Sequence, residues 1–522
     1  MNIKTFGSQR QYWFNSQELI ESAEYIRILQ RRPVPHEANP LVVADRPWEG
    51  TVLQLFAAVE HDPTVVSRQE ADGPWRMWYE GHPGPVNLCL AVSDDGIRWR
   101  KPALGIEEFA GSTANNLVLQ TGYWDAHQPA VVRSPAETDP ARRYKLYYWV
   151  GPRWGRWATG TESAPADLIA RYPQNGVYLA FSADGVRWTP HGRAPVLPVL
   201  PSGDASGRAV ELNIWDVNTV LWDEQRDCYR SFHVVARREP GAGLTRRSIA
   251  TSESEDGIRF SVSRPVLWPT EEDDAWGERL GGKRVEYYGL HVWTLAGFYL
   301  GLLWVFLITQ TSKVPQSRLW DDGMVAPYLV YSPDGLTWRH LPVREPFIPT
   351  GPAGSFQAGS IYSAGRPVAV GDALRFYYHG VSYTHGADEP IDSPHRYSGI
   401  GLATLPRDRY VAWQAGTAEG VLRTVPLRLS DQELHLNLDA ARGATRVALL
   451  GLDGSPLPGY SLEDCLPLTA DGLDQVVQWR GGSDLSALNG EMVRLLFALR
   501  HSALYTWEYR IRNSANAQDR NY

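Results

Sequence analysis

Short runs in which hydrophobic and polar residues alternate follow one another along most of the chain, a pattern typical of half-buried β-strands. Between them, a seven-residue segment occurs four times. It reads Ser-Asp-Asp-Gly-Ile-Arg-Trp at 93–99, and similar copies lie at 182–188, 254–260 and 332–338. Asp-Gly between two alternating runs is a strong hairpin signal, because the turn needs a positive φ that Gly adopts easily. The pattern therefore predicts one supersecondary unit used repeatedly.

Each repeat carries an aromatic run, preceded by an apolar strand. The five aromatic runs lie at 75–79, 144–148, 229–233, 298–302 and 374–378. The first four lead to a hairpin of the kind described above, whereas the fifth leads to a strand at 400–403 and a degenerate hairpin at 406–410. Four strands per repeat, at intervals of about 70 to 90 residues, predict a β-propeller with five blades.

The two ends of the chain differ from the repeats. Residues 17–30 carry Leu19, Ala23 and Ile26 near one helical face and precede Pro33, which predicts a short N-terminal helical segment. After residue 415 the Asp-Gly hairpin no longer occurs, and strands alternate with Gly, Pro and Asp turns, as in a β-sandwich. The predicted organisation is all-β: an N-terminal segment, a propeller, a sandwich and a tail at 1–40, 41–415, 416–512 and 513–522.

Bulk composition narrows the classes of partner. The 522 residues carry a net charge of −8 without a Lys/Arg-rich block, so we expect no nucleic-acid partner. The three cysteines are far apart and fit neither a disulfide framework nor a zinc site, and we expect no cofactor. The N-terminus lacks an apolar signal segment, and the apolar run at 298–308 is too short to span a bilayer. We therefore expect a cytoplasmic protein without a membrane partner.

The start of the first strand in each repeat is where chemistry is expected, because these positions converge at one mouth of a propeller channel. Four of the five starts carry a carboxylate: Glu49, Asp125, Asp216 and Glu286. Like charges in a partly desolvated pocket raise one another's pKa, so the four acids would not all ionise together. Cleavage of a glycosidic bond uses such a set, one acid protonating the leaving oxygen while a carboxylate attacks or activates water.

Other residues near these strands are candidates for binding a sugar. Aromatic side chains offer apolar faces to a sugar ring, and polar ones hydrogen-bond its hydroxyl groups. The candidate substrate-binding residues are Trp48, Asp125, His127, Trp215, Arg284, Gln357, His379 and His385. The hairpin aspartates, by contrast, are predicted to be structural, and no His or Cys spacing indicates a metal.

The repeated hairpins, the mouth carboxylates and the trailing sandwich together resemble the five-bladed propeller glycoside hydrolases of families 32 and 43. The resemblance implies an O-glycosyl hydrolase with an oligosaccharide or glycoside as its substrate. It places a nucleophile or base at Glu49, a tuning carboxylate at Asp216 and the proton donor at Glu286, with Asp125 as a further pocket acid. The family 32 signatures Asn-Asp-Pro-Asn-Gly, Arg-Asp-Pro and Glu-Cys are absent, so the resemblance does not extend to fructan specificity or to a retaining mechanism.

Two alternatives stay open at this point. A glycoside phosphorylase of the family 130 type would need one acid and a basic phosphate pocket, for which Arg237, Arg238 and Arg284 are candidates. A non-catalytic carbohydrate-binding propeller would use the same acids only as hydrogen-bond acceptors, since fold alone does not determine function.

Overall fold

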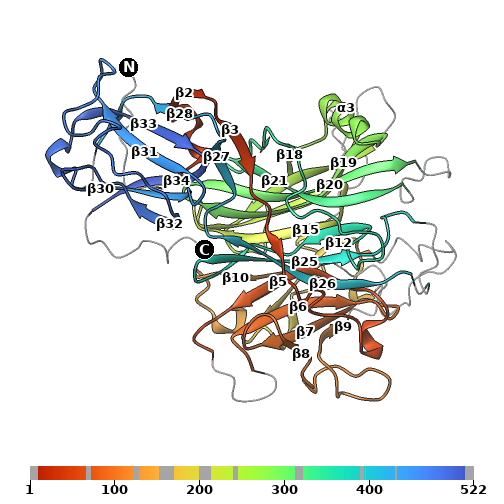
Figure 1. Cartoon of the computed structure of the whole chain (residues 1–522). Coiled ribbons are helices and arrows are strands. Elements are labelled where there is room, and N and C mark those ends of the chain that lie inside the picture. Colours follow the sequence, from red (N-terminus) through yellow and green to blue (C-terminus); the bar gives the residue numbers. More distant parts are fainter. Residues whose placement is uncertain are drawn as a thin grey trace.

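The structure is a computed structural model of the chain, and it describes residues 10–65, 72–120, 128–151, 170–198, 213–238, 245–311, 321–387, 393, 395–429 and 432–511. This part of the chain is nearly all β, in several antiparallel sheets (Figure 1). Helical structure within it is confined to short segments such as α1 (Trp13–Ser16) and α3 (Glu271–Arg279). None of the described helices is long and apolar enough to cross a membrane.

Five antiparallel sheets contain the repeats, and in the first four the strands pair in chain order. The first sheet consists of β5 (Leu53–His61), β6 (Trp75–Gly81), β7 (Asn87–Ser93) and β8 (Trp99–Arg100), with β9 (Leu117–Gln120) also on β7. The second consists of β10 (Ala130–Arg133), β11 (Tyr144–Val150), β12 (Gly176–Ser182) and β13 (Thr189–Pro190), with β14 (Leu197–Pro198) also on β12. The third consists of β15 (Asn213–Asp223), β16 (Cys228–Arg238), β17 (Thr245–Ser254) and β18 (Arg264–Leu267).

The remaining two sheets complete the set. The fourth consists of β19 (Arg284–Leu295), β20 (Phe298–Gln310), β21 (Asp322–Ser332) and β22 (Arg339–His340). The fifth consists of β23 (Ser360–Ser363), β25 (Ala373–Val381), β26 (Ser398–Pro406) and β4 (Val34–Pro35), with β24 (Val368–Val370) also on β25. Its outer strand therefore comes from the N-terminal part of the chain, in place of the degenerate hairpin.

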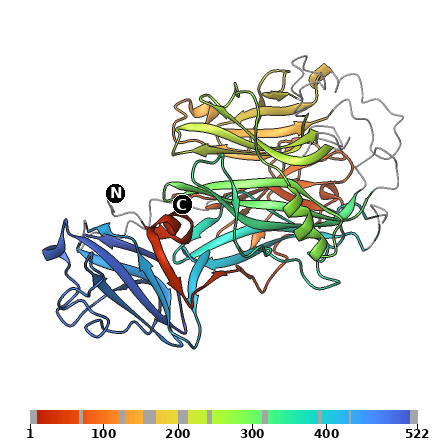
Figure 2. The ribbon, with the colours of Figure 1, turned by 90° about the horizontal axis from the view of Figure 1, so that it is seen from above.

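The first strands of the five sheets, β5, β10, β15, β19 and β23, are called the inner strands below. Along the chain β5 contacts β10, β10 contacts β15, and β15 contacts β19. β23 contacts β21 of the fourth sheet on one side and β5 of the first sheet on the other. Figure 2 shows the five sheets gathered in one body, with the C-terminal strands beside it.

The four Asp-Gly hairpins have the predicted turn and a further role. Gly96, Gly185, Gly257 and Gly335 all have φ between 68° and 75°. Each of these glycines also accepts, through its carbonyl oxygen, a hydrogen bond from the second strand of a neighbouring sheet. The donors are Tyr377 Oη to Gly96 (2.7 Å), Trp78 Nε1 to Gly185 (2.7 Å), Tyr147 Oη to Gly257 (2.8 Å) and Arg230 Nη2 to Gly335 (2.8 Å). The hairpins therefore join the fifth sheet to the first, the first to the second, the second to the third and the third to the fourth.

Two further sheets contain the C-terminal strands. One consists of β3 (Arg27–Gln30), β27 (Val411–Ala415), β34 (Ser502–Arg510), β30 (Glu433–Asp439) and β32 (Asp471–Val476), with β1 (Gln11–Tyr12) on β34. The other consists of β2 (Ile20–Glu24), β28 (Gly420–Thr424), β33 (Met492–Arg500) and β29 (Leu427–Arg428), with β31 (Ala444–Leu450) on β33. One hydrophobic core joins both sheets, through Leu436, Trp507 and Phe497, to Leu300 and Phe376 of the fourth and fifth sheets.

The predicted helix over residues 17–30 is wrong. Only residues 13–19 are helical, as α1 and a 3₁₀ turn (Gln17–Leu19), and the chain then forms the strands β2 and β3. β2 pairs with β28 and β3 with β27, at opposite ends of the sequence. Tyr25, between the two strands, has a positive φ of 53°, which ends any regular structure there. Pairing with distant strands thus overrides a weak local helix pattern.

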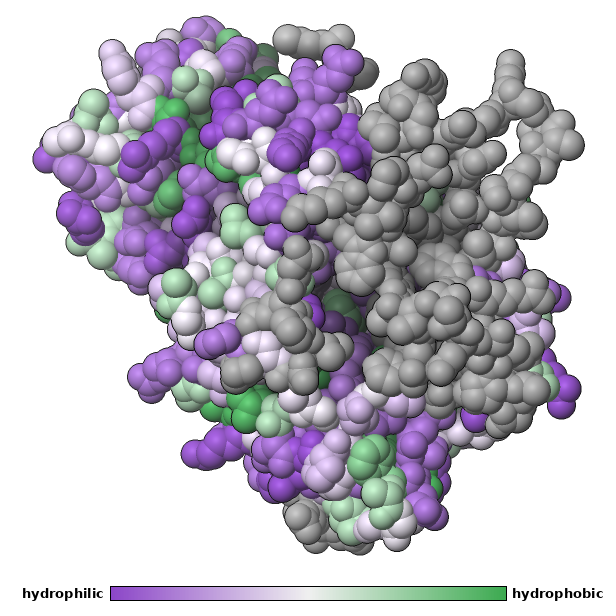
Figure 3. All heavy atoms as spheres, turned by 90° about the vertical axis from the view of Figure 1, so that its right-hand side faces the viewer, coloured by the Kyte–Doolittle hydropathy of each residue, from purple (hydrophilic) through white to green (hydrophobic). Residues whose placement is uncertain are grey.

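The surface drawn in Figure 3 is mostly hydrophilic over the described residues, and hydrophobic residues appear there only in small separate areas. The large hydrophobic side chains that are exposed, such as Tyr25, Val262 and Leu452, are scattered along the sequence.

Candidate functional site

Three inner strands carry an irregularity at the same depth, near their starts. The pairing register shifts between Gln54 and Ala58 of β5, between Ile214 and Asn218 of β15, and between Tyr287 and Gly289 of β19. Bulges re-aim side chains and are frequent next to active sites. Phe56, Asp216 and Tyr288 lie within these irregular segments. The irregularities therefore indicate a candidate site at the starts of the inner strands.

Glu286 of β19 is the best-defined acid at these strand starts. Its side chain is 1% exposed, and its Oε2 accepts a hydrogen bond from Arg247 Nη1 of β17 at 2.7 Å. Arg284 Nη2 lies 3.2 Å from the other carboxylate oxygen, Oε1. Arg284 also pairs with Asp321, just before β21. An ion pair with two guanidinium groups requires the carboxylate form of Glu286 and fixes its orientation.

Asp216 of β15 belongs to the same group of charges. It is half-buried, whereas Arg247 is almost completely buried. Burial lowers the pKa of Arg247, but the carboxylate of Glu286 and, more weakly, the nearby Tyr288 hydroxyl and the carboxylate of Asp216 more than offset it and raise that pKa. Two carboxylates from neighbouring inner strands therefore act on one buried guanidinium group.

A tyrosine–histidine pair completes this side of the site. Tyr288 follows Glu286 on the same face of β19, and the guanidinium carbon of Arg247 lies 5.0 Å from the centre of its ring. Its Oη lies 2.9 Å from His385 Nε2, in the loop after β25. Burial, followed by the charge of Arg247, lowers the pKa of His385 to about 4, so the imidazole is neutral at neutral pH. A neutral His385 can accept, through Nε2, the hydrogen bond that the Tyr288 hydroxyl donates.

Glu49, the predicted base or nucleophile, has a fully buried carboxylate with several partners. Oε1 accepts a hydrogen bond from Tyr79 Oη at 2.5 Å and lies 2.7 Å from Lys101 Nζ. Oε2 accepts the backbone N–H groups of Asp45 and Arg46 at 2.9 and 3.0 Å. These contacts hold the 45–50 segment in place, so the carboxylate of Glu49 has a structural role. Its catalytic role stays a prediction from sequence.

A second carboxylate of the first sheet lies close to this segment. Glu80, at the end of β6, is 1% exposed, and its Oε2 is 3.2 Å from Nε2 of His82. Its Oε1 accepts the backbone N–H of Gln128, just before β10. The His82 side chain is 21% exposed and so can be reached from outside, unlike Glu49.

The other predicted binding residues are placed as follows. Trp48 donates its indole N–H to Asn116 at 2.6 Å, and Gln357 accepts a hydrogen bond from Tyr378 Oη at 2.6 Å. His379 is fully buried in an aromatic cluster, 4.7 Å from Phe56 and 4.8 Å from Tyr362 between ring centres. Burial lowers its pKa to about 3, so it is a neutral packing group. Asp125 and His127 lie outside the described residues, as does the side chain of Trp215.

A cavity of about 830 Å³ lies at the opposite ends of the inner strands. Its lining includes Glu60, Arg133, Trp222 and Thr294, near the ends of β5, β10, β15 and β19. Phe56 of β5, Trp304 of β20, Tyr362 of β23 and His379 of β25 form one aromatic cluster. None of the described lining residues is a predicted site residue, so the cavity lies at the end of the inner strands away from Glu286 and Asp216.

Several members of the site were not selected from the sequence: Arg247, Tyr288, Asp321, Glu80 and His82. Tyr288 could have been found, because Arg284, Glu286 and Tyr288 are spaced by two, as are residues on one face of a regular strand. Arg247 belongs to a third strand, and no spacing relates it to Glu286. Within the described residues there is no group of three or more His, Cys, Asp or Glu side chains able to hold a metal ion.

No protein-family model matches the chain, and no curated protein matches it either. Among solved structures, the chain is similar to the protein in a complex of BT0996 with RGII, with 14% identity over 75% of this chain and 94% of the other, at a TM-score of 0.43. A structure from the GH130 family of mannoside phosphorylases and glycoside hydrolases has 14% identity over 72% and 94%, at a TM-score of 0.40. The Bombyx mori GH32 β-fructofuranosidase BmSUC1 has 10% identity over 96% and 95%, at a TM-score of 0.39.

Proposed function

We propose that the five sheets are the blades of one β-propeller, that the C-terminal sheets form a β-sandwich, and that the chain is a glycoside hydrolase. Its active site would lie at the starts of the inner strands. The observation that carries this proposal is the buried Glu286–Arg247 ion pair together with a second, half-buried carboxylate, Asp216, acting on the same guanidinium group. Two carboxylates in different surroundings are what acid–base cleavage of an acetal requires.

The contacts of Glu286 and Asp216 support a division of roles between them. Arg247 and Arg284 lie against the two carboxylate oxygens of Glu286, so these oxygens face guanidinium groups and are poorly placed to protonate a leaving group. We therefore assign Glu286 the role of the ionised partner, which attacks the anomeric carbon or activates water. Asp216, which is more exposed, is then the proton donor to the leaving oxygen. This assignment differs from the one that the family resemblance implies, in which Glu286 is the proton donor, Asp216 a tuning carboxylate and Glu49 the nucleophile or base.

Tyr288 and His385 would support this chemistry from one side. Their hydrogen bond fixes the Tyr288 ring beneath Arg247, and Arg247 in turn orients Glu286. The aromatic rings of Tyr288 and Phe306 also exclude water from the ion pair, because the Arg247 guanidinium carbon lies 5.0 and 5.6 Å from their centres. Exclusion of water strengthens each electrostatic contact within the site.

The experiment that tests this proposal measures hydrolysis of a panel of aryl glycosides and oligosaccharides. On a substrate that the wild type cleaves, Asp216→Asn is expected to lower kcat by about 10²- to 10⁴-fold when the leaving group is poor. With dinitrophenol as the leaving group no proton donor is needed, so most activity should return. Glu286→Gln should remain inactive with both leaving groups. If instead Glu286→Gln regains activity with dinitrophenol and Asp216→Asn does not, Glu286 is the proton donor.

One observation favours a second candidate, a glycoside phosphorylase. Arg247 and Arg284 both lie at Glu286, and guanidinium pairs bind phosphate well. In that case inorganic phosphate, instead of water, would be the nucleophile, and turnover would depend on its concentration. Release of a sugar 1-phosphate, absent in phosphate-free buffer, would favour this candidate over hydrolysis.

A further inference from the structure

The carboxylate–imidazole pair of Glu80 and His82 has no role in the chemistry assigned above. It lies on the first sheet, whereas Glu286, Arg247 and Asp216 come from the third and fourth sheets. The first and fourth sheets are not adjacent in the order of contacts, so the two groups face the mouth from different sides. A side chain of the first sheet would therefore contact a part of the ligand away from the bond that is cleaved.

The contacts of His82 determine which of its nitrogens is available. An ionised carboxylate can only accept hydrogen bonds, so Nε2, 3.2 Å from Glu80 Oε2, carries the proton and donates it. In the neutral imidazole Nδ1 then has the lone pair and is an acceptor. Within the part of the chain that the structure describes, no hydrogen bond uses Nδ1 of His82. The side chain is 21% exposed, which leaves this nitrogen accessible to a ligand.

The backbone around His82 is held firmly. The His82 N–H donates to the carbonyl of Glu49 at 2.8 Å, and Gly50 forms a parallel bridge with His82. Gly50 has φ +66°, and a Cβ at this position would lie 2.2 Å from the His82 carbonyl oxygen, so only glycine allows this approach. The structural role of Glu49 therefore extends to positioning His82, because Glu49 fixes the segment on which this backbone rests.

The other oxygen of Glu80 links the pair to the second sheet. It accepts the N–H of Gln128, a non-glycine residue with φ +57°. Backbone conformations of this kind are strained and tend to occur at functional sites. Gln128 also accepts, through its carbonyl, a hydrogen bond from Asn218 Nδ2 of the third sheet at 3.1 Å. Glu80, Gln128 and Asn218 thus form one connected chain of contacts across three sheets.

Two acceptor atoms in this chain have no partner among the described residues: Gln128 Oε1 and Asn218 Oδ1. The side chains are 3% and 2% exposed, and buried polar atoms without a partner are uncommon. With Nδ1 of His82, they are acceptors from three different sheets. Such a set selects a ligand that offers several hydrogen-bond donors, and a sugar ring with adjacent hydroxyl groups is a ligand of this kind.

We propose that His82, positioned by Glu80, accepts a hydrogen bond from a ring hydroxyl of the bound sugar and forms, with Gln128 and Asn218, a subsite that determines which sugar binds. This inference rests on the proposed function, since it names the recognition element of the same mouth. His379 of the fifth sheet also lies close enough to His82 for the two rings to interact electrostatically. It is neutral at neutral pH, as described above, and so adds no charge to the subsite.

Binding can test this subsite without any turnover. The full-length chain with ¹⁵N-labelled histidine is titrated with individual hexoses and pentoses, and then with the monodeoxy forms of the sugar that binds best. We expect the Nδ1 resonance of His82 to shift with one sugar and its affinity to fall about 10- to 100-fold when one particular hydroxyl is removed. His82→Leu should bind the sugar and this deoxy form equally. Glu80→Gln should disturb the His82 tautomer and lower the same discrimination.

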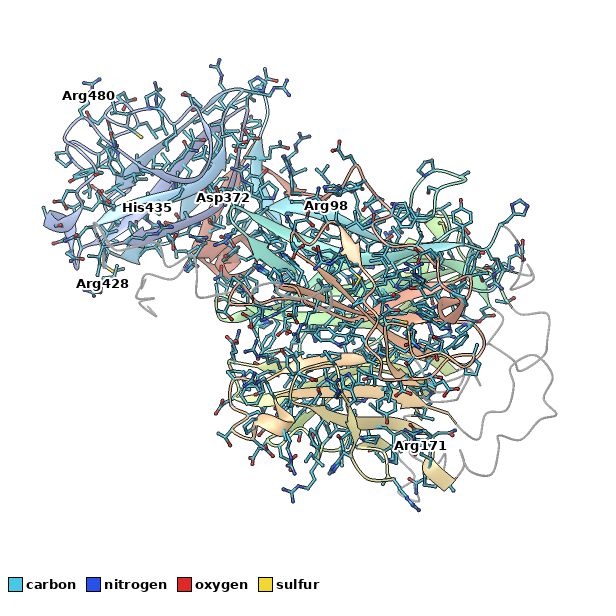
Figure 4. The ribbon with its side chains drawn as sticks, turned by 90° about the horizontal axis from the view of Figure 1, so that it is seen from below. Arg98, Arg171, Asp372, Arg428, His435 and Arg480 are labelled. Atoms are coloured by element: carbon cyan, nitrogen blue, oxygen red, sulfur yellow. The ribbon has the colours of Figure 1, made fainter. Side chains whose placement is uncertain are left out.

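His435 and Asp474 provide a matched control, because His435 Nδ1 lies 2.7 Å from an Asp474 carboxylate oxygen in the C-terminal sheets. Figure 4 shows His435 in that C-terminal part, well away from Arg171, which precedes β12 in the sequence. His435→Leu removes a similar imidazole–carboxylate contact and should leave sugar discrimination unchanged.

Three results would overturn the inference. One is a wild-type protein in which no sugar shifts the His82 resonance, and another is a His82→Leu variant that keeps the full discrimination. The third is an equal shift of that resonance by Na⁺ or Ca²⁺ alone, which would make the subsite an ion site. If sugars bind as expected but no glycoside is ever cleaved, the proposed hydrolase fails while the subsite stands.

Discussion

Arg247 Nη1 of β17 lies 2.7 Å from Glu286 Oε2 of β19, and their side chains are 5% and 1% exposed. The pair joins the third sheet to the fourth at the starts of the inner strands. Taking two charges out of water carries a large desolvation cost, which their attraction only partly offsets unless further hydrogen bonds contribute. Arg284 and the ring of Tyr288 supply such additional contacts.

The pair leads to a prediction about stability. Glu286→Gln or Arg247→Met alone leaves one buried charge without its partner, which should lower the free energy of unfolding by about 3–5 kcal/mol. The double variant should lose clearly less than the sum of the two. Urea unfolding followed by tryptophan fluorescence measures all three. Strictly additive losses would mean that the two side chains are not coupled.

The contact between Tyr377 and Gly96 supports a second prediction. The Tyr377 hydroxyl donates to the Gly96 carbonyl at 2.7 Å and joins the fifth sheet to the first. Tyr377→Phe should lower the free energy of unfolding by about 1–2 kcal/mol, because it leaves a buried carbonyl without its donor. Tyr25→Phe, at a position 79% exposed, is the control and should change little. If both variants lose the same free energy of unfolding, the loss in Tyr377→Phe does not come from the hydrogen bond to Gly96.

Buried histidines give a third prediction, on pH. Burial lowers the pKa of His233, His340 and His385 to about 4 and that of His291 to about 3, from an ordinary value of 6.5. Below pH 6.5 the unfolded chain therefore takes up protons that the folded chain does not, so the free energy of unfolding falls as the pH falls toward 4.

The melting temperature between pH 7.5 and 4 measures this dependence. The melting temperature should decline steadily over that range. In His291→Gln the decline should be shallower, because unfolding of this variant takes up about one proton fewer. A melting temperature that is constant from pH 7 to 5, or an unchanged slope in His291→Gln, would contradict buried neutral histidines.

The sequence predicted the strands and hairpins of the repeats well, because an alternating pattern and an Asp-Gly turn are local properties. The N-terminal helix failed for the opposite reason. The residues of β2 and β3 take their conformation from β28 and β27, which lie almost four hundred residues later in the chain. The bridging role of the hairpins, such as Gly96 with Tyr377, likewise depends on neighbouring sheets and leaves no local signature.

The site was predictable only in part. Counting back from the hairpins found Glu286 and Asp216, which act on the same buried arginine. It also selected Glu49, in the turn before β5, and passed over Glu80 at the end of β6. Glu80 contacts the accessible His82, whereas Glu49 is enclosed by Lys101 and Tyr79. This difference depends on the directions of the two side chains, which are determined by packing and not by their spacing along the sequence.

Turnover of a glycoside panel by three matched proteins tests the central claim most directly. These are the wild type, Glu286→Gln and Asp223→Asn. Asp223 is also a buried carboxylate paired with an arginine, with Oδ2 3.5 Å from Arg230 Nη1 and 2.8 Å from Tyr299 Oη, and it lies at the far end of β15. We predict that the wild type and Asp223→Asn cleave the same glycoside at similar rates, and that Glu286→Gln loses at least about 10²-fold in kcat. Equal rates in the wild type and Glu286→Gln would contradict the proposed site.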